Sequence, residues 1–113
     1  MRALTVDDLT TQLHRQFGFS DFRPGQREVI DAVLSRRDAM AVMPTGQGKS
    51  LCYQLPATVL PGLTLVISPL IALMQDQVNS VRAKGIAAAA FHSGLSEQER
   101  DRVVLDLKLR RLQ

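Results

Sequence analysis

Residues 43–50 of the chain read Met43-Pro44-Thr45-Gly46-Gln47-Gly48-Lys49-Ser50. This stretch follows a short apolar run, residues 39–43, and precedes a longer apolar segment, residues 49–59. The short run is typical of a strand buried on both faces, and the longer segment is typical of a helix. Glycines between a strand and a helix let main-chain N–H groups turn toward an anion, and the helix adds the positive end of its dipole. The stretch therefore predicts a phosphate-binding loop.

The last residues of this loop have defined chemical roles. The Lys49 ammonium would reach the β- and γ-phosphates of a nucleoside triphosphate, and the Ser50 hydroxyl would coordinate Mg²⁺, so we expect both to be catalytic. The cradle for the phosphates would be made by Thr45, Gly46, Gln47 and Gly48. The strict pattern has glycine where this chain has Met43. The alternative is a glycine-containing turn after a buried strand, with Lys49 as a surface lysine.

Apolar periodicity and turn residues predict the elements on either side of the loop. We expect helices over about 5–17, 24–34, 49–59, 70–84 and from 97 onward, and strands over 39–43, 63–67 and 87–91. Gly18 and Gly85 are placed to end helices, and Ser96 with Glu99 forms a capping box. Segment 87–91 is ambiguous because alanine favours a helix. Two helices followed by alternating strands and helices predict an α/β fold, a parallel sheet with flanking helices.

Composition bounds the class of protein. At 113 residues the chain forms one core at most, and 45% hydrophobic residues argue against disorder. The net charge of +3 permits a polyanionic partner without requiring one, and the basic run 108–111 is more often a solvated face. The single Cys52 excludes an internal disulfide, fits a reducing compartment and is expected to be a packing residue. No stretch resembles a membrane span or a signal peptide, so we expect a cytoplasmic protein without a membrane partner.

Three stretches together resemble the motifs of RecQ-type helicases in superfamily 2. The first, Met43-Pro44-Thr45-Gly46-Gln47-Gly48-Lys49-Ser50-Leu51-Cys52-Tyr53-Gln54-Leu55-Pro56-Ala57, looks like the family's Walker A motif, in which methionine at the first position is usual and glycine is commoner than Gln47. The second, Phe17-Gly18-Phe19 with Phe22-Arg23-Pro24-Gly25-Gln26, resembles motif 0. The third, Ser68-Pro69-Leu70-Ile71-Ala72-Leu73-Met74-Gln75-Asp76-Gln77-Val78, is similar to motif Ia. The resemblance implies that residues 1–113 are part of a RecA-like helicase ATP-binding domain.

The resemblance also implies how the nucleotide base is held. Gln26 would read the adenine edge, because an amide offers both a donor and an acceptor. Phe19 would lie against the base, and Arg23 would hold the nucleotide from the other side through its planar guanidinium. Without the resemblance, Phe19 and Phe22 would be core residues and Gln26 a solvated helix residue.

Nucleic-acid contacts are implied further along the chain. In the family, motif Ia holds the backbone of single-stranded DNA, so Ser68 and Pro69 are the expected contacts. The alternative for Ser68 is a plain N-terminal cap of the following helix. His92-Ser93-Gly94 aligns with a later DNA-contacting turn, which makes Ser93 a third candidate. We assign no catalytic role to His92.

The function implied is that of an ATP-dependent 3′-to-5′ DNA helicase in DNA repair and recombination, using ATP and Mg²⁺ and acting on single-stranded and duplex DNA. One alternative is a DEAD-box-like RNA helicase, although motif Ia of that class typically reads Pro-Thr-Arg-Glu-Leu. The other is a non-catalytic module that binds nucleotide or DNA.

Phosphoryl transfer also needs an acidic anchor for the metal and a group that positions water. In the family both come from an Asp-Glu-x-His motif, and the sequence contains none; Asp101 and Asp106 have no following histidine. We therefore expect a partial domain, and we predict that the purified 113-residue chain hydrolyses no ATP. Phosphate release measured with and without single-stranded DNA checks this, and DNA-stimulated hydrolysis would refute it.

Overall fold

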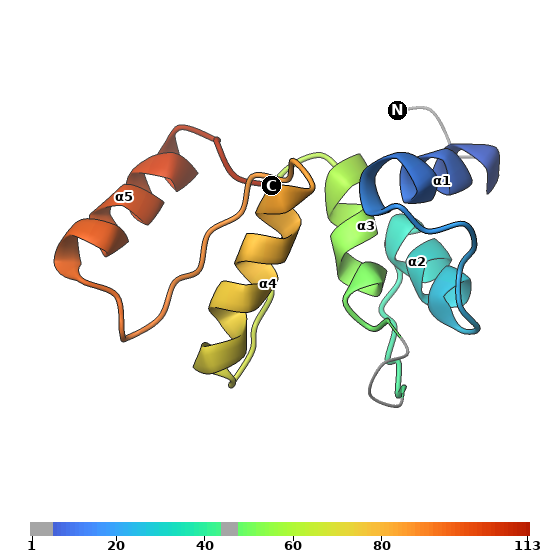
Figure 1. Ribbon diagram of the computed structural model, residues 1–113, viewed down its shortest axis with the longest axis horizontal. Coiled ribbons are helices and arrows are strands. Elements are labelled where there is room, and N and C mark those ends of the chain that lie inside the picture. Colours follow the sequence, from blue (N-terminus) through green and yellow to red (C-terminus); the bar gives the residue numbers. More distant parts are fainter. Residues whose placement is uncertain (1–5, 44–47) are drawn as a thin grey trace. The chain divides into compact units, whose positions relative to one another are not determined.

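The computed structural model describes residues 6–43 and 48–113. Its helices are α1 (Val6–Gln12), the π-helical turn η1 (Leu13–Phe17), α2 (Gln26–Leu34), α3 (Leu51–Val59), α4 (Ile71–Ala83) and α5 (Glu97–Lys108) (Figure 1). The chain divides into two compact units, Met1–Pro61 and Gly62–Gln113. Within the described ranges no helix is both long enough and apolar enough to span a bilayer.

The prediction of a parallel sheet with flanking helices is wrong. Segments 39–43, 63–67 and 87–91 have no regular secondary structure, and no strand occurs in the part of the chain that the structure describes (Figure 1). Instead of lying inside a sheet, Met40, Val42 and Ile67 are 93%, 90% and 96% exposed. An apolar run indicates only that side chains favour burial, whereas a strand also needs a neighbouring segment that pairs with its N–H and C=O groups. These segments form no such ladder, and the described fold is helical.

The first unit has a core made by one face of α1, η1 and α2 and by most of α3. Leu9, Leu13 and Phe17 recur every four residues and are 2%, 0% and 6% exposed, as their helical spacing predicts. Ile30 from α2 and Leu55 from α3 are both 0% exposed. Burial of these apolar side chains away from water accounts for most of the stability of such a small unit.

Hydrogen bonds fix one helix end and join two helices in this core. Gly18 has a φ of 75°, and its N–H donates to the carbonyl of Leu13, which confirms the predicted end of the first helix. The Gln12 side chain donates to Thr58 Oγ1 at 3.1 Å, so α1 is also tied to α3. Cys52 is buried in α3, and burial raises the pKa of its thiol, which confirms a packing role.

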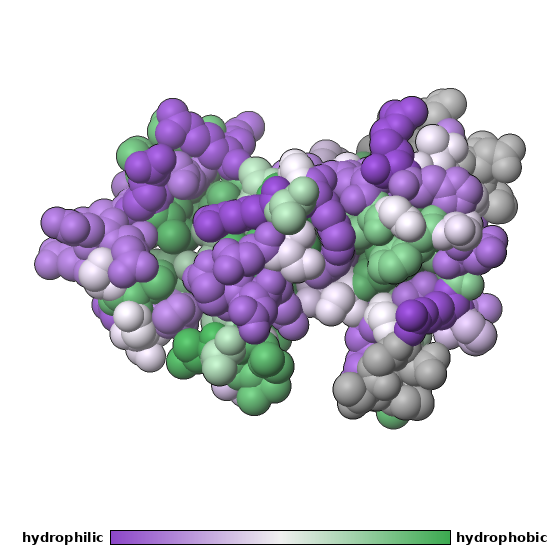
Figure 2. All heavy atoms as spheres, in the orientation of Figure 1, coloured by the Kyte–Doolittle hydropathy of each residue, from purple (hydrophilic) through white to green (hydrophobic). Residues whose placement is uncertain are grey.

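The second unit buries far less apolar surface. Its buried hydrophobic residues are Val81 and Ile86, and α5 buries none. Apolar side chains gather at the surface near the start of α4 (Figure 2), where the exposed large residues are Ile67, Leu70, Ile71 and Leu73. Local motifs are nevertheless formed as predicted: Gly85, with a φ of 85°, follows α4, and Ser96 and Glu99 make the capping box of α5.

A matched pair of substitutions tests where the core lies. Ile30→Val removes one methylene from a fully buried side chain and should lower the free energy of unfolding by about 0.5–1.5 kcal/mol. Ile67→Val removes the same group from an exposed side chain and should change it by less than about 0.5 kcal/mol. Urea denaturation followed by circular dichroism measures both. Equal losses would contradict the assigned core.

Candidate nucleotide-binding site

The site begins where the chain enters α2. Gly25 precedes the helix with a φ of 87°, a left-handed conformation that other residues rarely adopt. A Cβ at Gly25 would lie 3.3 Å from Cε of Met43, the first residue of the predicted loop. The start of α2 and the start of the loop are therefore in contact, although 18 positions separate them (43 − 25).

The Gln26 amide joins these two stretches by hydrogen bonds. Its Oε1 accepts from the main-chain N–H of Arg23 at 2.7 Å, and its Nε2 donates to the carbonyl of Gly48 at 2.9 Å. Gln26 is only 3% exposed, so both bonds are made in a largely dehydrated setting. A buried amide group left without a partner costs about 1–3 kcal/mol, which makes this bridge a strong constraint on the loop. The alternative of a solvated Gln26 is wrong.

Gly48 meets a steric requirement as well as a conformational one. Its φ is 77°, and a Cβ at this position would lie 2.3 Å from Nε2 of Gln26. Such a contact cannot exist, so any side chain at residue 48 would push the Gln26 amide away. The sequence indicated a glycine whose main-chain N–H can turn toward an anion. The structure adds that the missing side chain at residue 48 leaves room for the Gln26 amide.

Lys49 and Ser50 lie at the N-terminal end of α3. The N–H of Leu51 donates to the carbonyl of Gly48 at 3.3 Å, so the chain turns directly into the helix. Lys49 is exposed and Ser50 half-buried, and the Ser50 hydroxyl does not cap the helix. An ammonium and a hydroxyl thus stand beside the positive end of the helix dipole. These features fit a phosphate and its metal.

Other predicted nucleotide contacts have mixed outcomes. Thr45, Gly46 and Gln47 lie outside the described residues. Phe19 is 48% exposed, so it is not the core residue that the alternative required. Arg23 is exposed, and its Cδ would lie 3.8 Å from a Cβ at Gly48. The sequence analysis did not consider Arg27, whose guanidinium lies 5.6 Å from the centre of the Phe22 ring and whose Nε pairs with Asp31 Oδ1 at 2.9 Å.

The candidate nucleic-acid residues belong to the second unit. Ser68 Oγ accepts from the N–H of Leu70 at 3.2 Å, but Leu70 occupies the N-cap position of α4, so Ser68 is not the plain helix cap of the alternative. Pro69 is exposed beside it, and Ser93 is exposed in a turn before α5.

Comparison with known proteins identifies relatives for most of the chain. Residues 23–111 match the family model described as DEAD/DEAH box helicase. The chain is 54% identical to the ATP-dependent DNA helicase RecQ of Synechocystis over 88% of this chain and 21% of that protein. It is 48% identical to the probable ATP-dependent DNA helicase RecS of Bacillus subtilis over 85% of this chain and 20% of that protein. It is 50% identical to the ATP-dependent helicase SGS1 of Saccharomyces cerevisiae over 83% of this chain and 7% of that protein.

These relatives confirm the resemblance to RecQ-type helicases that the three motifs indicated. The chain spans at most about a fifth of the length of each of these relatives.

The steric role of Gly48 can be separated from its conformational role. Gly48→Ala and Gly18→Ala each place a side chain at a positive φ, but nothing lies within 4 Å of a Cβ at Gly18. Both should lose about 1–2 kcal/mol of unfolding free energy from backbone strain. Gly48→Ala should lose about 1–3 kcal/mol more because the Gln26 bond is broken. Urea denaturation measures both, and in a Gln26→Ala background the extra loss should vanish. Its persistence there would contradict the proposed clash.

Proposed function

The chain belongs to the DEAD/DEAH box helicase family, and from that premise we propose that it is the ATP-binding portion of a RecQ-like ATP-dependent DNA helicase. The observation that carries the proposal is the Gln26–Gly48 hydrogen bond, which brings the base-reading motif and the phosphate loop together. A glycine-containing turn with an unrelated surface lysine would not need this contact.

The hydrogen-bonding capacity of Gln26 supports the reading of adenine. A side-chain amide has two N–H groups and a carbonyl with two lone pairs. One N–H is used by Gly48 and one lone pair by Arg23, so one donor and one acceptor position are left. Adenine presents a complementary pair, the N7 acceptor and the N6 amino donor. In this proposal Phe19 covers one face of the base and Arg23 the other.

The phosphates are assigned to the start of α3. In this proposal the Lys49 ammonium binds the β- and γ-phosphates and stabilises the charge that develops on the transferred group. The main chain of Thr45, Gly46, Gln47 and Gly48 surrounds the phosphates, and the Ser50 hydroxyl ligates Mg²⁺. The metal, when bound, neutralises charge on the phosphate oxygens.

Single-stranded DNA is the proposed polymer partner, with Ser68, Pro69 and Ser93 as its contacts. The RecQ and RecS relatives are named as DNA helicases, which favours DNA over the RNA of the DEAD-box alternative. Movement from 3′ to 5′ and a role in repair and recombination are proposed as consequences of the family resemblance. A cytoplasmic location is proposed with them, as the sequence analysis expected.

Substitution of Lys49 tests the phosphate assignment. Lys49→Ala should weaken ATP binding by about tenfold to a hundredfold, since a hydrogen bond to a charged group contributes about 1.5–3 kcal/mol. Adenosine affinity should be unchanged, because the base contacts are retained, and wild type should bind ATP more tightly than GTP. Isothermal titration calorimetry measures these affinities. The control is Lys108→Ala on the exposed face of α5.

Unchanged ATP affinity in Lys49→Ala would contradict the phosphate assignment. Equal affinity of the wild-type chain for ATP and GTP would contradict the role of Gln26 in reading adenine.

A further inference from the structure

A short turn before α5 is closed by three hydrogen bonds of different kinds. The N–H of Leu95 donates to the carbonyl of His92 at 3.3 Å, which defines a turn over residues 92–95. The N–H of Gly94 donates to Nδ1 of the His92 ring at 3.0 Å. The guanidinium of Arg100 donates through Nη2 to the carbonyl of Ser93 at 3.0 Å. We refer to residues 92–95 as the clamped turn.

The His92 ring acts in this turn as an acceptor. Nδ1 can accept from the Gly94 N–H only when it carries no proton itself. The ring lies close to the glycine, because a Cβ at Gly94 would stand 3.1 Å from both Cε1 and Nδ1. This i-to-i+2 bond has the geometry of the turns that asparagine and aspartate side chains form with their own main chain. His92 therefore shapes the turn.

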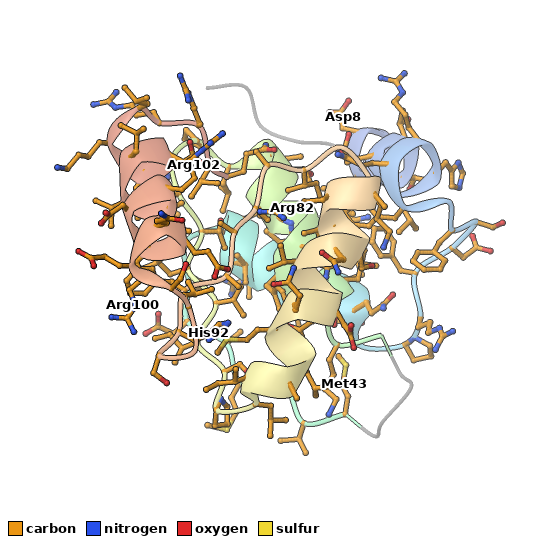
Figure 3. All side chains as sticks on the ribbon, turned by 60° about the vertical axis from the view of Figure 1, so that its left-hand side comes forward. Asp8, Met43, Arg82, His92, Arg100 and Arg102 are labelled. Carbon is orange, nitrogen blue, oxygen red and sulfur yellow. The ribbon has the colours of Figure 1, made fainter. Side chains whose placement is uncertain are left out.

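Arg100 is held beside the turn by the start of α5. Ser96 Oγ accepts from the N–H of Glu99 at 3.1 Å, and Glu99 Oε1 accepts from the N–H of Ser96 at 3.2 Å. The N–H of Arg100 then donates to the carbonyl of Ser96 at 3.0 Å. With the first helical turn fixed in this way, the Arg100 side chain reaches back to the loop that carries His92 (Figure 3).

The charges around Arg100 favour a positioning role over direct binding of a phosphate. Glu97 and Glu99 occupy the same helical turn and Asp101 is the next residue, so Arg100 is not part of a basic patch. The Ser96 main-chain N–H and then the Ser96 hydroxyl hold the pKa of Glu99 below its ordinary value, so this carboxylate stays charged. The exposed polar side chain that the clamped turn presents is that of Ser93.

We propose that Arg100 and His92 are positioning residues for nucleic-acid binding, which hold the clamped turn so that Ser93 meets a phosphate of single-stranded DNA. The proposal rests on the proposed function, because the Ser93 contact belongs to it. Neither residue touches the DNA; both act through the main chain of the turn.

Removal of the Arg100 clamp is compared with removal of an equal charge elsewhere on α5. Arg102 is exposed and pairs with Asp106 at 3.7 Å. Affinity for a fluorescein-labelled oligothymidylate is measured by anisotropy. Arg100→Ala should weaken binding by about threefold to tenfold, the effect of one lost hydrogen bond, and Arg102→Ala by less than about twofold. Equal weakening would mean that only charge matters and would overturn the role of Arg100.

Two substitutions of His92 separate the acceptor from the ring. Asparagine can accept the Gly94 N–H through its side-chain carbonyl, whereas phenylalanine keeps a ring without an acceptor. His92→Asn should retain wild-type affinity for the oligonucleotide, and His92→Phe should lose as much as Arg100→Ala. Equal loss in both variants would overturn the role of His92.

Amide chemical shifts distinguish failure of the clamp from failure of the proposed function. In ¹H–¹⁵N spectra of the 113-residue chain, Arg100→Ala should move the Ser93 and Gly94 resonances and Arg102→Ala should not. Unmoved resonances in Arg100→Ala would overturn the clamp and leave the DNA assignment standing. If the wild-type chain does not bind the oligonucleotide, or if Ser93→Ala binds it as tightly as the wild-type chain does, the DNA assignment and the positioning proposal both fail.

Discussion

The buried amide of Gln26 connects the entry of α2 to the residue that precedes α3, and the geometry of the candidate site depends on this bridge. Its two hydrogen bonds, at 2.7 Å to Arg23 and 2.9 Å to Gly48, leave no polar atom of the amide unpaired. Loss of either partner would leave a buried polar group without a hydrogen bond. The same amide is assigned to the nucleotide base. A movement of the amide on binding the base would therefore change its hydrogen bond to the Gly48 carbonyl, which directly precedes Lys49. The proposed recognition of the base and placement of the phosphates therefore share one side chain.

Different interactions stabilise each of the two units internally. The first unit packs Leu13, Ile30 and Leu55 into a core with no solvent exposure, so burial of apolar surface dominates. The second unit buries two hydrophobic residues, and the main chain of Gln113 bonds to Thr64 and Ala87, which lie far from it along the sequence. Local hydrogen bonds are added by the capping box of α5 and by the clamped turn. A turn fixed by a few such bonds can be altered by a single substitution, which suits a surface whose proposed task is to present Ser93.

The site residues differ in how far the sequence could reveal them. Lys49 and Ser50 were predicted at the start of a helix and lie there, since the Gly-Lys-Ser pattern is tied to that local geometry. Gln26 was identified by resemblance alone, because nothing in its neighbours along the chain shows that it is buried. Arg100 was missed: its partner is a main-chain carbonyl, and no residue type marks such an acceptor in a sequence. The signal that could have found it is the capping box, which places Arg100 on the first turn of α5, facing the preceding loop.

By itself, the sequence determined where the helices lie and several of their ends. The spacing of Leu9, Leu13 and Phe17, the stops at Gly18 and Gly85, and the capping box of α5 were all predicted and are all present. A helix forms hydrogen bonds between residues four apart, so its partners are contained in the same stretch of sequence. Only the tertiary structure decided that segments 39–43, 63–67 and 87–91 form no sheet and that Gln26 bonds to Gly48, 22 positions away. Both depend on partners distant along the chain, and an apolar run or a lone amide does not specify which partner it meets.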